Sequence, residues 1–522
     1  MKKNLIPMLL VLCLLVSLLL AGCGGGETKE TEAATKPAQF LDTDKDFSRL
    51  RTPGSQEDAY DYQLFFQPEE DVTGQPYVGD TMPFYDNGTY YIYYLKEGGD
   101  SYNHAVYLAE TKDFLSYKEY DEPILTPDRD GGQDGWIGTG SVVEVGGEYL
   151  FFYTGHSDSN FSEFKETIML AKGSTPTAFE KVAGWEITPP AELGQKNDFR
   201  DPQAYYDEAS DTIVLTVTAS KDGKARILKY TLSRDLTEKT YDGIIFTHPD
   251  GNIWNLECSD TFRLGDTWYL TYSAQDDTLW YATSDSRYGP YSEPKPIDGK
   301  LFYAAKHVED GTASYMVGWA RRSESPSSTQ EVSAWAGNLM VQQLAQAADG
   351  SLLLEAPKSV RDTFTVERPL LTEGTDCTVE SGSRYSYTEA FTAYERFLIT
   401  GEFSFTGTGS FGLAFDFNGR EDKYKLISLN PADGTLSLVF NEGSTPITET
   451  AVTLEAGKTY SFTYLQEGSV GTFYVDGQAA LTVRLYGVSG KSVRLFAENN
   501  TVEWTNLREY TLPQEVAYEA AA

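Results

Sequence analysis

The strongest constraint on the fold of this chain is a β-hairpin pattern that recurs at nearly constant spacing. Each copy has a small or polar start, an apolar strand, a turn rich in Gly, Asp or Asn, and a second strand rich in aromatic residues. Four copies start at residues 80, 141, 201 and 257, and a fifth starts near residue 302. The spacings are therefore 61, 60, 56 and about 45 residues. Helical periodicity is scarce, so the repeating unit is made of strands.

A repeat of this length has room for about four strands, which is typical of one blade of a β-propeller. Five such blades fill the chain from about residue 60 to about residue 360. A large β-sandwich or a solenoid is the alternative architecture, and the near-equal spacing of the strand starts disfavours both. We therefore predict an all-β chain in which residues 47–362 form a five-bladed β-propeller.

The hairpin repeat ends near Val366, and a different strand pattern follows it. Short segments of alternating apolar and polar residues are separated by Gly- and Asp-rich turns, at residues 397–405, 409–417, 423–429, 436–440, 458–464, 472–475 and 493–496. Many short strands of this kind are typical of a β-sandwich. The chain of 522 residues is also too long for a single hydrophobic core. We therefore predict that residues 363–522 form a C-terminal β-sandwich.

The N-terminus has the pattern of a bacterial export signal. Met1-Lys2-Lys3 is basic, and a Leu-rich run at residues 9–20 follows it that is short for a membrane-spanning helix. The run ends in Leu20-Ala21-Gly22-Cys23, which resembles the signal box of a bacterial lipoprotein. The resemblance implies that residues 1–22 are removed and that Cys23 receives a lipid. We expect residues 23–46 to be a flexible tether, and the protein to be extracytoplasmic and bound to the bacterial cell membrane through its lipid anchor alone.

The charge and the few Cys and His residues argue against several classes of function. The net charge is −36, and a chain this acidic repels nucleic acid, so we expect no nucleic-acid partner. Four Cys and four His residues show no C-x-x-C or H-x-x-x-H spacing, so we expect neither a metal site nor a cofactor. Cys258 and Cys377 lie far apart, and two buried free thiols are favoured over a disulfide.

Three acidic residues stand at the beginning of three predicted blades. Asp80, Asp201 and Glu257 each lie on a short stretch that leads into a hairpin, at places that look equivalent in the repeat. The first strand of each blade lines the axis of a propeller, so we expect the three carboxylates to meet in one pocket. Two carboxylates that face one bond are the working groups of a glycoside hydrolase. The alternative is that each Asp caps a turn and that Arg200 only forms an ion pair with Asp201.

Several motifs resemble those of glycoside hydrolase family 32, the family of fructan hydrolases and invertases. Arg200-Asp201-Pro202 is similar to the family's R-D-P motif, and Glu257-Cys258 is similar to its E-C motif. Further stretches resemble family signatures in the family's order, at residues 103–106 with 111–117, 138–141, 302–305, 318–319 and 366–369. The resemblance covers most of the chain beyond the signal peptide. It implies a five-bladed propeller followed by a β-sandwich.

The resemblance also implies a reaction and roles for individual residues. Asp80 would be the nucleophile, Glu257 the general acid and base, and Asp201 an acceptor of hydrogen bonds from sugar hydroxyls, oriented by Arg200. Candidate sugar contacts are Trp136, Thr139, Trp254, Tyr303 and Trp319. The implied reaction is retaining hydrolysis of O-glycosidic bonds in fructosides or fructans of the sucrose, inulin or levan type. The expected partner is therefore a carbohydrate substrate.

One motif departs from the family pattern. Where the family has W-M-N-D-P-N-G, this chain has Gly79-Asp80-Thr81-Met82-Pro83, which keeps the acid but lacks the flanking Asn residues and the adjoining Pro. The departure leaves the accepted sugar open. Three other functions also stay open: an inverting propeller glycosidase of the arabinan type, a fructosyltransferase, and a sugar-binding surface lipoprotein without catalytic activity.

Overall fold

The computed structural model describes residues 50–51, 61–68, 77–98, 103–128, 132–157, 163–322, 334–394, 396–417, 420–486, 488–513 and 516. These residues belong to one compact unit, Phe40–Ala522. The expected signal peptide (residues 1–22), the tether (residues 23–46) and the lipid-bearing Cys23 lie outside the described residues. Within the described part of the chain, we find no helix that is long and apolar enough to span a bilayer.

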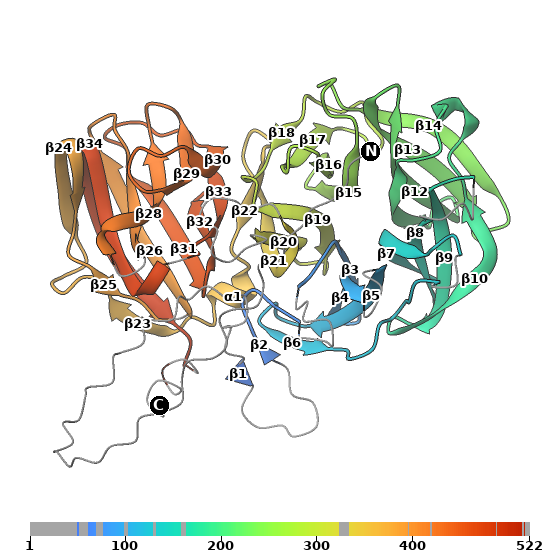
Figure 1. Ribbon diagram of the computed structural model, residues 1–522, viewed down its shortest axis with the longest axis horizontal. Coiled ribbons are helices and arrows are strands. Elements are labelled where there is room, and N and C mark those ends of the chain that lie inside the picture. The colour runs from blue at the N-terminus through green and yellow to red at the C-terminus, as the bar shows by residue number, and fades with distance from the viewer. Residues whose placement is uncertain are drawn as a thin grey trace, which may run out of the picture. The chain divides into compact units, whose positions relative to one another are not determined.

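Five antiparallel sheets follow one another along the first part of the chain, and each is one blade of a β-propeller. Figure 1 shows these sheets arranged around a central axis. Blade 1 contains β3 (Thr81–Asp86), β4 (Thr89–Gly98), β5 (Asn103–Thr111) and β6 (Ser116–Glu119), and it is extended by β2 (Asp61–Tyr62) and β1 (Leu50–Arg51). Blade 2 contains β7 (Trp136–Val145), β8 (Glu148–His156), β9 (Glu166–Thr175) and β10 (Ala178–Ile187).

The remaining three blades have four strands each. Blade 3 contains β11 (Phe199–Asp207), β12 (Thr212–Lys221), β13 (Lys224–Ser233) and β14 (Lys239–Thr247). Blade 4 contains β15 (Leu256–Leu264), β16 (Thr267–Ala274), β17 (Leu279–Ser284) and β18 (Lys295–Pro296). Blade 5 contains β19 (Phe302–Glu309), β20 (Ser314–Arg322), β21 (Ala334–Gln346) and β22 (Leu352–Glu355). A 3₁₀ helix, η2 (Ala191–Leu193), precedes β11, and a short helix, α1 (Lys358–Arg361), follows β22.

Tight turns join several of the paired strands. Asn87-Gly88, Gly146-Gly147 and Asp222-Gly223 all have positive φ angles, between 48° and 88°. Two consecutive residues in this conformation make a type I′ turn, whose twist matches that of the flanking strands. Gly, Asn and Asp adopt it most readily, which is why these residues recur between the strands of the sequence pattern.

The innermost strands of the blades form a closed ring. β3 contacts both β7 and β19, and β11 and β15 complete the circle between them. The segment before β3 also pairs with blade 5: Val78 and Gly337 exchange backbone hydrogen bonds of 2.8 and 2.9 Å, and the Leu339 N–H donates to the Phe66 carbonyl at 2.8 Å. Residues at the start of the propeller therefore complete its last blade.

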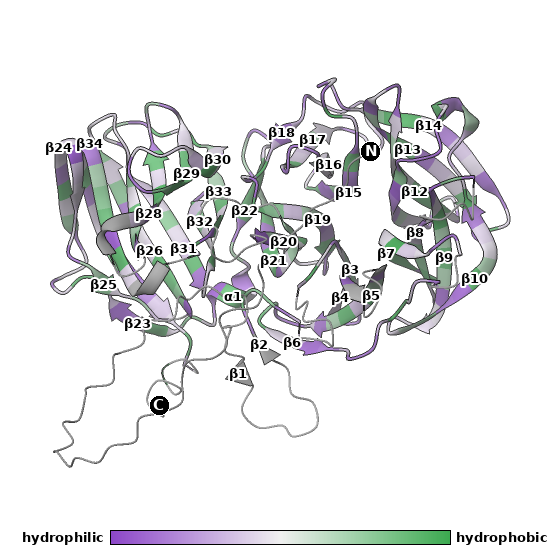
Figure 2. Ribbon diagram, viewed as in Figure 1, coloured by the Kyte–Doolittle hydropathy of each residue, from purple (hydrophilic) through white to green (hydrophobic). Residues whose placement is uncertain are grey.

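The C-terminal sheet has twelve strands and is organised around one long strand, β34 (Val488–Thr511). Its other strands are β23 (Val366–Pro369), β24 (Cys377–Tyr387), β25 (Phe391–Thr392), β26 (Arg396–Phe405), β27 (Phe411–Phe417), β28 (Arg420–Asn430), β29 (Thr435–Phe440), β30 (Pro446–Ala451), β31 (Tyr460–Glu467), β32 (Val470–Val475) and β33 (Ala479–Arg484). Hydrophobic and hydrophilic residues alternate along these strands (Figure 2). The inward-facing residues, among them Phe403, Phe462 and Trp504, form a separate core, so the sheet is sandwich-like.

Buried polar groups join the propeller to the sandwich. Asp298, which follows β18, accepts hydrogen bonds from the Thr482 backbone N–H (3.0 Å) and hydroxyl (2.6 Å) in β33. Arg484 donates to the Asn338 side-chain oxygen (2.8 Å) and to the Ala320 carbonyl (3.0 Å) in blade 5. Burial raises the pKa of Asp298 to about 7, although its hydrogen bonds to Thr482 act to lower it.

The predicted fold class is confirmed: the described chain is almost entirely β, with five propeller blades and a sandwich-like C-terminal sheet. All seven segments predicted in the C-terminal part are strands, whereas β23, β24, β25, β30 and β33 were missed. Cys258 is a buried free thiol and Cys377 a half-buried one. The expectation that both thiols are buried is therefore wrong for Cys377, which lies at the start of β24.

Candidate active site

The inner strands of blades 2 to 5 each contain a β-bulge. Their pairing with the second strand changes register between residues 138 and 140, 200 and 203, 257 and 260, and 303 and 306. In three of these bulges Asp201, Cys258 and Ala304 have φ angles of 56°, 52° and 50°. This left-handed conformation costs about 1–3 kcal/mol for a residue other than Gly. A bulge breaks the regular alternation of a strand and redirects the side chains beside it.

The bulges place the acids at two different positions of the repeat. Glu257 stands directly before the left-handed residue of its strand, as Arg200 does in blade 3. Asp201 is itself the left-handed residue and corresponds to Cys258. The expectation that Asp201 and Glu257 hold equivalent places is therefore wrong by one residue. The bulges redirect the strands, so the side chains of Asp201 and Glu257 come close to each other although they differ in register: the Cys258 N–H donates to Asp201, and Arg200 reaches Glu257.

Asp80 lies in the bend directly before β3 and is held by three donors. The Thr139 hydroxyl donates to its Oδ2 at 3.0 Å, and the Trp319 indole N–H donates to its Oδ1 at 3.2 Å. Burial raises the pKa of Asp80 to about 6, and the negative charge of Glu257 adds to the rise. Hydrogen bonds from Trp319, Thr139 and Trp335 act in the opposite direction. The carboxyl is thus fixed in place and protonates far more readily than an ordinary Asp.

The indole of Trp335, from β21, forms an aromatic wall beside Asp80. It stacks on His104 with ring centroids 4.3 Å apart and planes 6° apart, and His104 meets Trp136 edge-on at 5.3 Å. A Cβ atom at Gly79 would lie 2.2 Å from Trp335 Cζ2. Only glycine therefore fits directly before Asp80, because the indole occupies the space that a side chain would take. Gly79 stands where the W-M-N-D-P-N-G motif has the Asn before its Asp, so this packing is found at a position where the chain departs from that motif.

Asp201 is 3% exposed and is fixed from both sides. Its backbone N–H donates to the Thr154 hydroxyl at 2.9 Å, and its Oδ2 accepts from the Cys258 N–H at 2.9 Å. Burial raises the pKa of Asp201 to about 7; the charge of Arg200 opposes this rise, while the charges of Glu257 and Asp80 reinforce it. Cys258, the residue after Glu257, joins the three acids: its N–H donates to Asp201, and its Sγ lies 3.9 Å from the Thr139 hydroxyl that donates to Asp80. The structure therefore brings Asp80, Asp201 and Glu257 into one site.

Glu257 is partly accessible, with 29% of its side chain exposed. Its Oε2 accepts a hydrogen bond from the Tyr303 hydroxyl at 2.8 Å. Its Oε1 lies 3.5 Å from Gln275 Nε2 and 3.4 Å from Arg200 Nη2. Donors from blades 3, 4 and 5 therefore orient Glu257 while leaving part of its carboxyl open to the pocket.

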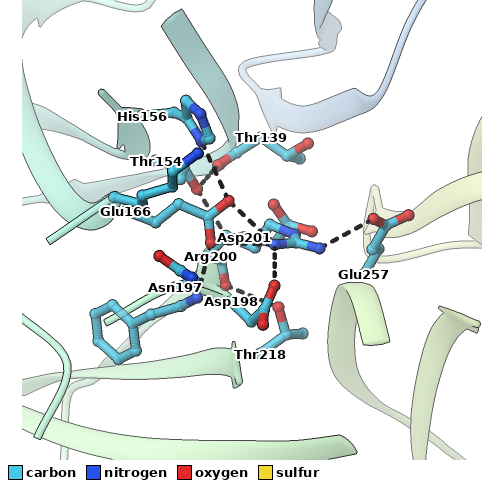
Figure 3. A network of polar contacts seen from close by, with 12 residues as sticks. Thr139, Thr154, His156, Glu166, Asn197, Asp198, Arg200, Asp201, Thr218 and Glu257 are labelled. Atoms are coloured by element: carbon cyan, nitrogen blue, oxygen red, sulfur yellow. Dashed lines mark hydrogen bonds and ion pairs between the residues drawn. The ribbon is translucent and has the colours of Figure 1, made fainter. Parts of the chain in front are cut away.

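Arg200 is the centre of an ionic network that Figure 3 shows from close by. Its Nη1 contacts both carboxylate oxygens of Glu166 at 3.0 and 3.1 Å and the Asp198 Oδ1 at 3.4 Å. Burial acts to raise the pKa of Glu166, but hydrogen bonding to His156 and the charge of Arg200 lower it to about 2. Glu166 therefore stays ionised and holds the guanidinium, whose other nitrogen reaches Glu257.

The candidate sugar contacts divide by accessibility. Thr139 (1% exposed) and Trp319 (0%) hold Asp80, and Tyr303 (6%) holds Glu257. These three side chains act on the acids, and the expectation that Trp319 touches the sugar does not fit its full burial. Trp136 is half-buried in the aromatic wall. Trp254 is 43% exposed three residues before Glu257 and is free to meet a ligand.

Sequence reasoning missed four residues of the site. Glu166 and Asp198 hold Arg200, Thr154 holds Asp201, and Trp335 lines the pocket beside Asp80. Asp198 stands two residues before Arg200, so its contact with Arg200 could have been predicted from the sequence. Glu166, Thr154 and Trp335 come from other strands and belong to none of the motifs quoted above.

The arrangement suits acid–base chemistry. Asp80 and Asp201 have pKa values raised towards neutrality, which is a property of catalytic carboxyls. The nearby Glu257 is partly exposed and oriented by donors. In the part of the chain that the structure describes, no cluster of three or more His, Cys, Asp or Glu side chains is arranged to bind a metal ion.

Comparison with known families identifies the relatives of this chain. Residues 66–357, more than half of the chain, match the family described as "Glycosyl hydrolases family 32 N-terminal domain". The chain belongs to glycosyl hydrolase family 32. This family 32 chain is 28% identical over 265 residues to a sucrose-6-phosphate hydrolase of Escherichia coli, a match that covers 47% of this chain and 54% of that protein. It is 24% identical over 337 residues to a fructan 1-exohydrolase of Triticum urartu, covering 57% and 54%.

The family 32 chain thus spans about half the length of the curated relatives it matches. Solved structures resemble it over most of its length. The sucrose-6-phosphate hydrolase of Lactobacillus gasseri gives a TM-score of 0.68 at 16% identity, covering 87% of this chain and 93% of that one. Fructan 1-exohydrolase IIa of Cichorium intybus gives 0.67 at 15% identity, covering 86% and 98%. At these identities the likeness supports the fold.

Proposed function

We propose that this protein is a retaining glycoside hydrolase that cleaves O-glycosidic bonds of fructosides or fructans of the sucrose, inulin or levan type. The observation that carries the proposal is the convergence of Asp80, Asp201 and Glu257: the N–H of Cys258, the residue after Glu257, donates to Asp201 Oδ2 at 2.9 Å, and the Cys258 Sγ lies 3.9 Å from the Thr139 hydroxyl that donates to Asp80. The pKa values of the two aspartates are raised. Membership of family 32 supports the substrate class. Relatives named sucrose-6-phosphate hydrolase and fructan 1-exohydrolase support it as well.

In the first step, the ionised Asp80 attacks the anomeric carbon while Glu257 gives a proton to the departing oxygen. A covalent glycosyl-enzyme forms, and the alcohol or sugar leaves as a neutral molecule. In the second step, Glu257 takes a proton from water, the resulting nucleophile attacks the same carbon, and Asp80 is released. Asp201 accepts hydrogen bonds from sugar hydroxyls while positive charge builds on the ring.

The neighbours of the acids suit these roles. Thr139 and Trp319 hold Asp80 through one oxygen each, so the attacking group is fixed before the substrate arrives. Tyr303 and Arg200 fix Glu257 from two sides. The 29% exposure of the Glu257 side chain leaves it able to reach a leaving group and then a water molecule.

A substrate panel tests the proposal. The chain without residues 1–22, carrying Cys23→Ser, is incubated with sucrose, sucrose 6-phosphate, inulin, levan and arabinan, and the released sugars are identified by chromatography. We expect free fructose from at least one fructoside. Glu257→Gln should lower kcat on unactivated substrates by about 100- to 10,000-fold, because a positioned general acid contributes that much. Glu208→Gln, at an exposed position of blade 3, is the matched control.

The form of the first product separates this proposal from its rivals. A first-formed anomer with the substrate's configuration, followed by NMR, supports retention. Inverted product or release of arabinose points to an inverting propeller glycosidase, and growth of oligosaccharides from sucrose points to a fructosyltransferase. Sugar binding without any turnover assigns the pocket to capture alone. Full turnover by a folded Glu257→Gln variant would falsify the role of Glu257.

We also propose that the protein is exported and anchored to the bacterial membrane by a lipid on Cys23. The basic start, the Leu-rich run and the Leu20-Ala21-Gly22-Cys23 box support this assignment. The full chain expressed in a bacterium should incorporate labelled fatty acid and sediment with membranes. Cys23→Ser should abolish both, and Cys258→Ser, at a buried thiol, should change neither.

A further inference from the structure

A buried lysine links two inner strands that are not adjacent in the propeller. Lys306, in β19 of blade 5, is 1% exposed, and its Nζ donates to the Gly140 carbonyl of β7 at 2.7 Å. β19 and β7 are not neighbours in the ring, because β3 lies between them and contacts both. The side chain therefore spans from blade 5 to blade 2. A buried ammonium costs several kcal/mol in desolvation, so its retention calls for a physical reason.

The carbonyl that Lys306 holds belongs to the segment that positions Asp80. Gly140 directly follows Thr139, whose hydroxyl donates to Asp80 Oδ2 at 3.0 Å. The Gly140 N–H faces Met82 Sδ at 3.0 Å, and a Cβ at this residue would lie 2.1 Å from a backbone oxygen of β8. This part of the β7 bulge is closely packed, and Lys306 holds its Gly140 carbonyl.

The charge of Lys306 also acts on the acids. Burial lowers the pKa of Lys306, and the surrounding Cys258, Asp260, Asp201 and Asp80 act in the opposite direction by favouring the ammonium. The interaction is mutual, so the ammonium favours the ionised carboxylates. Asp260 is itself buried and accepts hydrogen bonds from the His307 and Thr261 N–H groups.

Two other charged groups, Glu257 and Arg200, act on the aspartates. Glu257 raises the pKa values of both Asp80 and Asp201, and Arg200 lowers that of Asp201. Arg200 is already engaged by Glu166 and Asp198. Lys306 is therefore a second cation that interacts with the acids, and its charge offsets their mutual repulsion.

We propose that Lys306 is a positioning residue of this site: it holds the Gly140 carbonyl so that Thr139 donates to Asp80, and its positive charge favours the ionised forms of Asp80 and Asp201. The proposal rests on the proposed hydrolysis only for its kinetic readout. Lys306 makes two contributions, a hydrogen bond and a positive charge. Three substitutions separate them. Methionine removes both, glutamine keeps a donor without charge, and arginine keeps both.

The kinetic test compares Lys306→Met, Lys306→Gln and Lys306→Arg on the best substrate of the panel. We expect Lys306→Met to lower kcat by about 10- to 100-fold, since a small displacement of a reacting group has effects of this size. Loss of the cation raises the pKa of Asp80 and Asp201, so the acid limb of kcat/KM should move up by about one pH unit. Lys306→Gln should also move the acid limb up, but it should lower kcat less than Lys306→Met does. Lys306→Arg should leave the acid limb where it is in the wild-type enzyme.

Lys425→Met is the matched control, because Lys425 is also 1% exposed but lies in the sandwich. It should lower the melting temperature without moving the acid limb. A folded Lys306→Met enzyme with unchanged kcat and an unchanged acid limb overturns the proposal. A lower melting temperature alone, with the limb in place, overturns it as well, because that is the result of a merely structural role.

A second readout keeps the test independent of turnover. Aspartate carboxyl groups labelled with ¹³C are titrated by NMR, and the Asp80 signal is assigned by its loss in Asp80→Asn. Lys306→Gln should raise the titration midpoint of Asp80 and leave that of exposed Asp266 unchanged. If the wild-type chain cleaves no panel sugar, the proposed function fails while this result still decides the role of Lys306. An unmoved midpoint rejects it.

Discussion

Asp201 shows how one backbone conformation places a buried carboxyl of the candidate active site. With φ at 56° it occupies a region that Asp tolerates better than most residues, because its short polar side chain bonds locally. The cost is offset by the Thr154 hydroxyl, which accepts from the Asp201 N–H, and by the Cys258 N–H, which donates to the carboxylate. Cys258 is left-handed too, so two strained residues of adjacent blades support each other. The pocket is therefore shaped before any ligand binds.

The acid limb of the reaction should report the raised pKa of Asp80. Asp80 must be ionised to attack, and its folded pKa of about 6 lies above the ordinary value of 3.8. Lowering the pH through 6 protonates the nucleophile, so kcat/KM should fall below about pH 6, well above the pH at which an ordinary Asp is protonated. A pH–rate profile from pH 3.5 to 8 measures this.

Because Asp80, Asp201 and Glu257 interact, the apparent value belongs to the group of acids. Thr139→Val removes a donor to the carboxylate and should shift the limb further upward, whereas Thr139→Ser should not. A limb near pH 4 in the wild-type enzyme would mean that Asp80 is not the nucleophile or is not desolvated.

At the scale of the strand, hydrophobic pattern and turn chemistry were enough to predict the hairpins. The five predicted hairpins correspond to β3–β4, β7–β8, β11–β12, β15–β16 and β19–β20, and they follow from apolar runs and from turns rich in Gly, Asp and Asn. The bulges were not predictable, because the extra residue of a bulge leaves no mark in the apolar pattern. Thr154 was missed for the same reason: it lies on β8, and only the bulges of β7 and β11 bring it to Asp201.

Thr154 links the bulges of two neighbouring inner strands. Its hydroxyl accepts from the Asp201 N–H and donates to the Thr139 carbonyl, both at 2.9 Å. Thr154→Val keeps the shape but leaves both backbone groups without a partner, which costs about 1–3 kcal/mol for a buried group. We expect lower stability in urea unfolding and a lower kcat. Thr154→Ser, which keeps the hydroxyl, should stay close to wild type; equal loss in both variants would rule out the hydrogen bonds as the cause.

At the scale of the molecule, the order of motifs along the chain was more informative than any single motif. Asp80 and Glu257 lie 177 positions apart, and only the ring of blades makes them neighbours. The motif order predicted that ring and therefore the meeting of the acids. Glu166 was beyond reach, because it stands 34 residues before Arg200, in another blade, with no motif around it. Its ionic contact depends on how two blades pack, and sequence patterns record only what happens within a strand.

The junction between propeller and sandwich should loosen as the pH rises. The pKa of Asp298 is about 7 in the folded chain, above its ordinary value of 3.8, so the folded state binds more protons between these values. Its stabilising contribution is complete below about pH 4 and is lost as the pH rises through 7. Asp298→Asn removes the ionisation, so its melting temperature relative to wild type should rise between pH 5 and pH 8.

Calorimetry at several pH values measures this difference. Asp266→Asn, at a fully exposed carboxylate, is the control and should show no such trend. A constant difference between Asp298→Asn and wild type across this pH range would show that Asp298 ionises normally in the folded protein.

The pairing of Phe66 and Val78 with β21 sets the order in which the ring can be finished during synthesis. Both residues leave the ribosome early, but their partners Leu339 and Gly337 are translated almost last among the blades. Until β21 is made, the segment with Phe66 and Val78 lacks these backbone partners, and an unpaired segment of this kind invites pairing with other chains. A stalled or truncated product that stops after blade 4 would therefore be an aggregation hazard, and a factor that shields that segment would help the chain to mature.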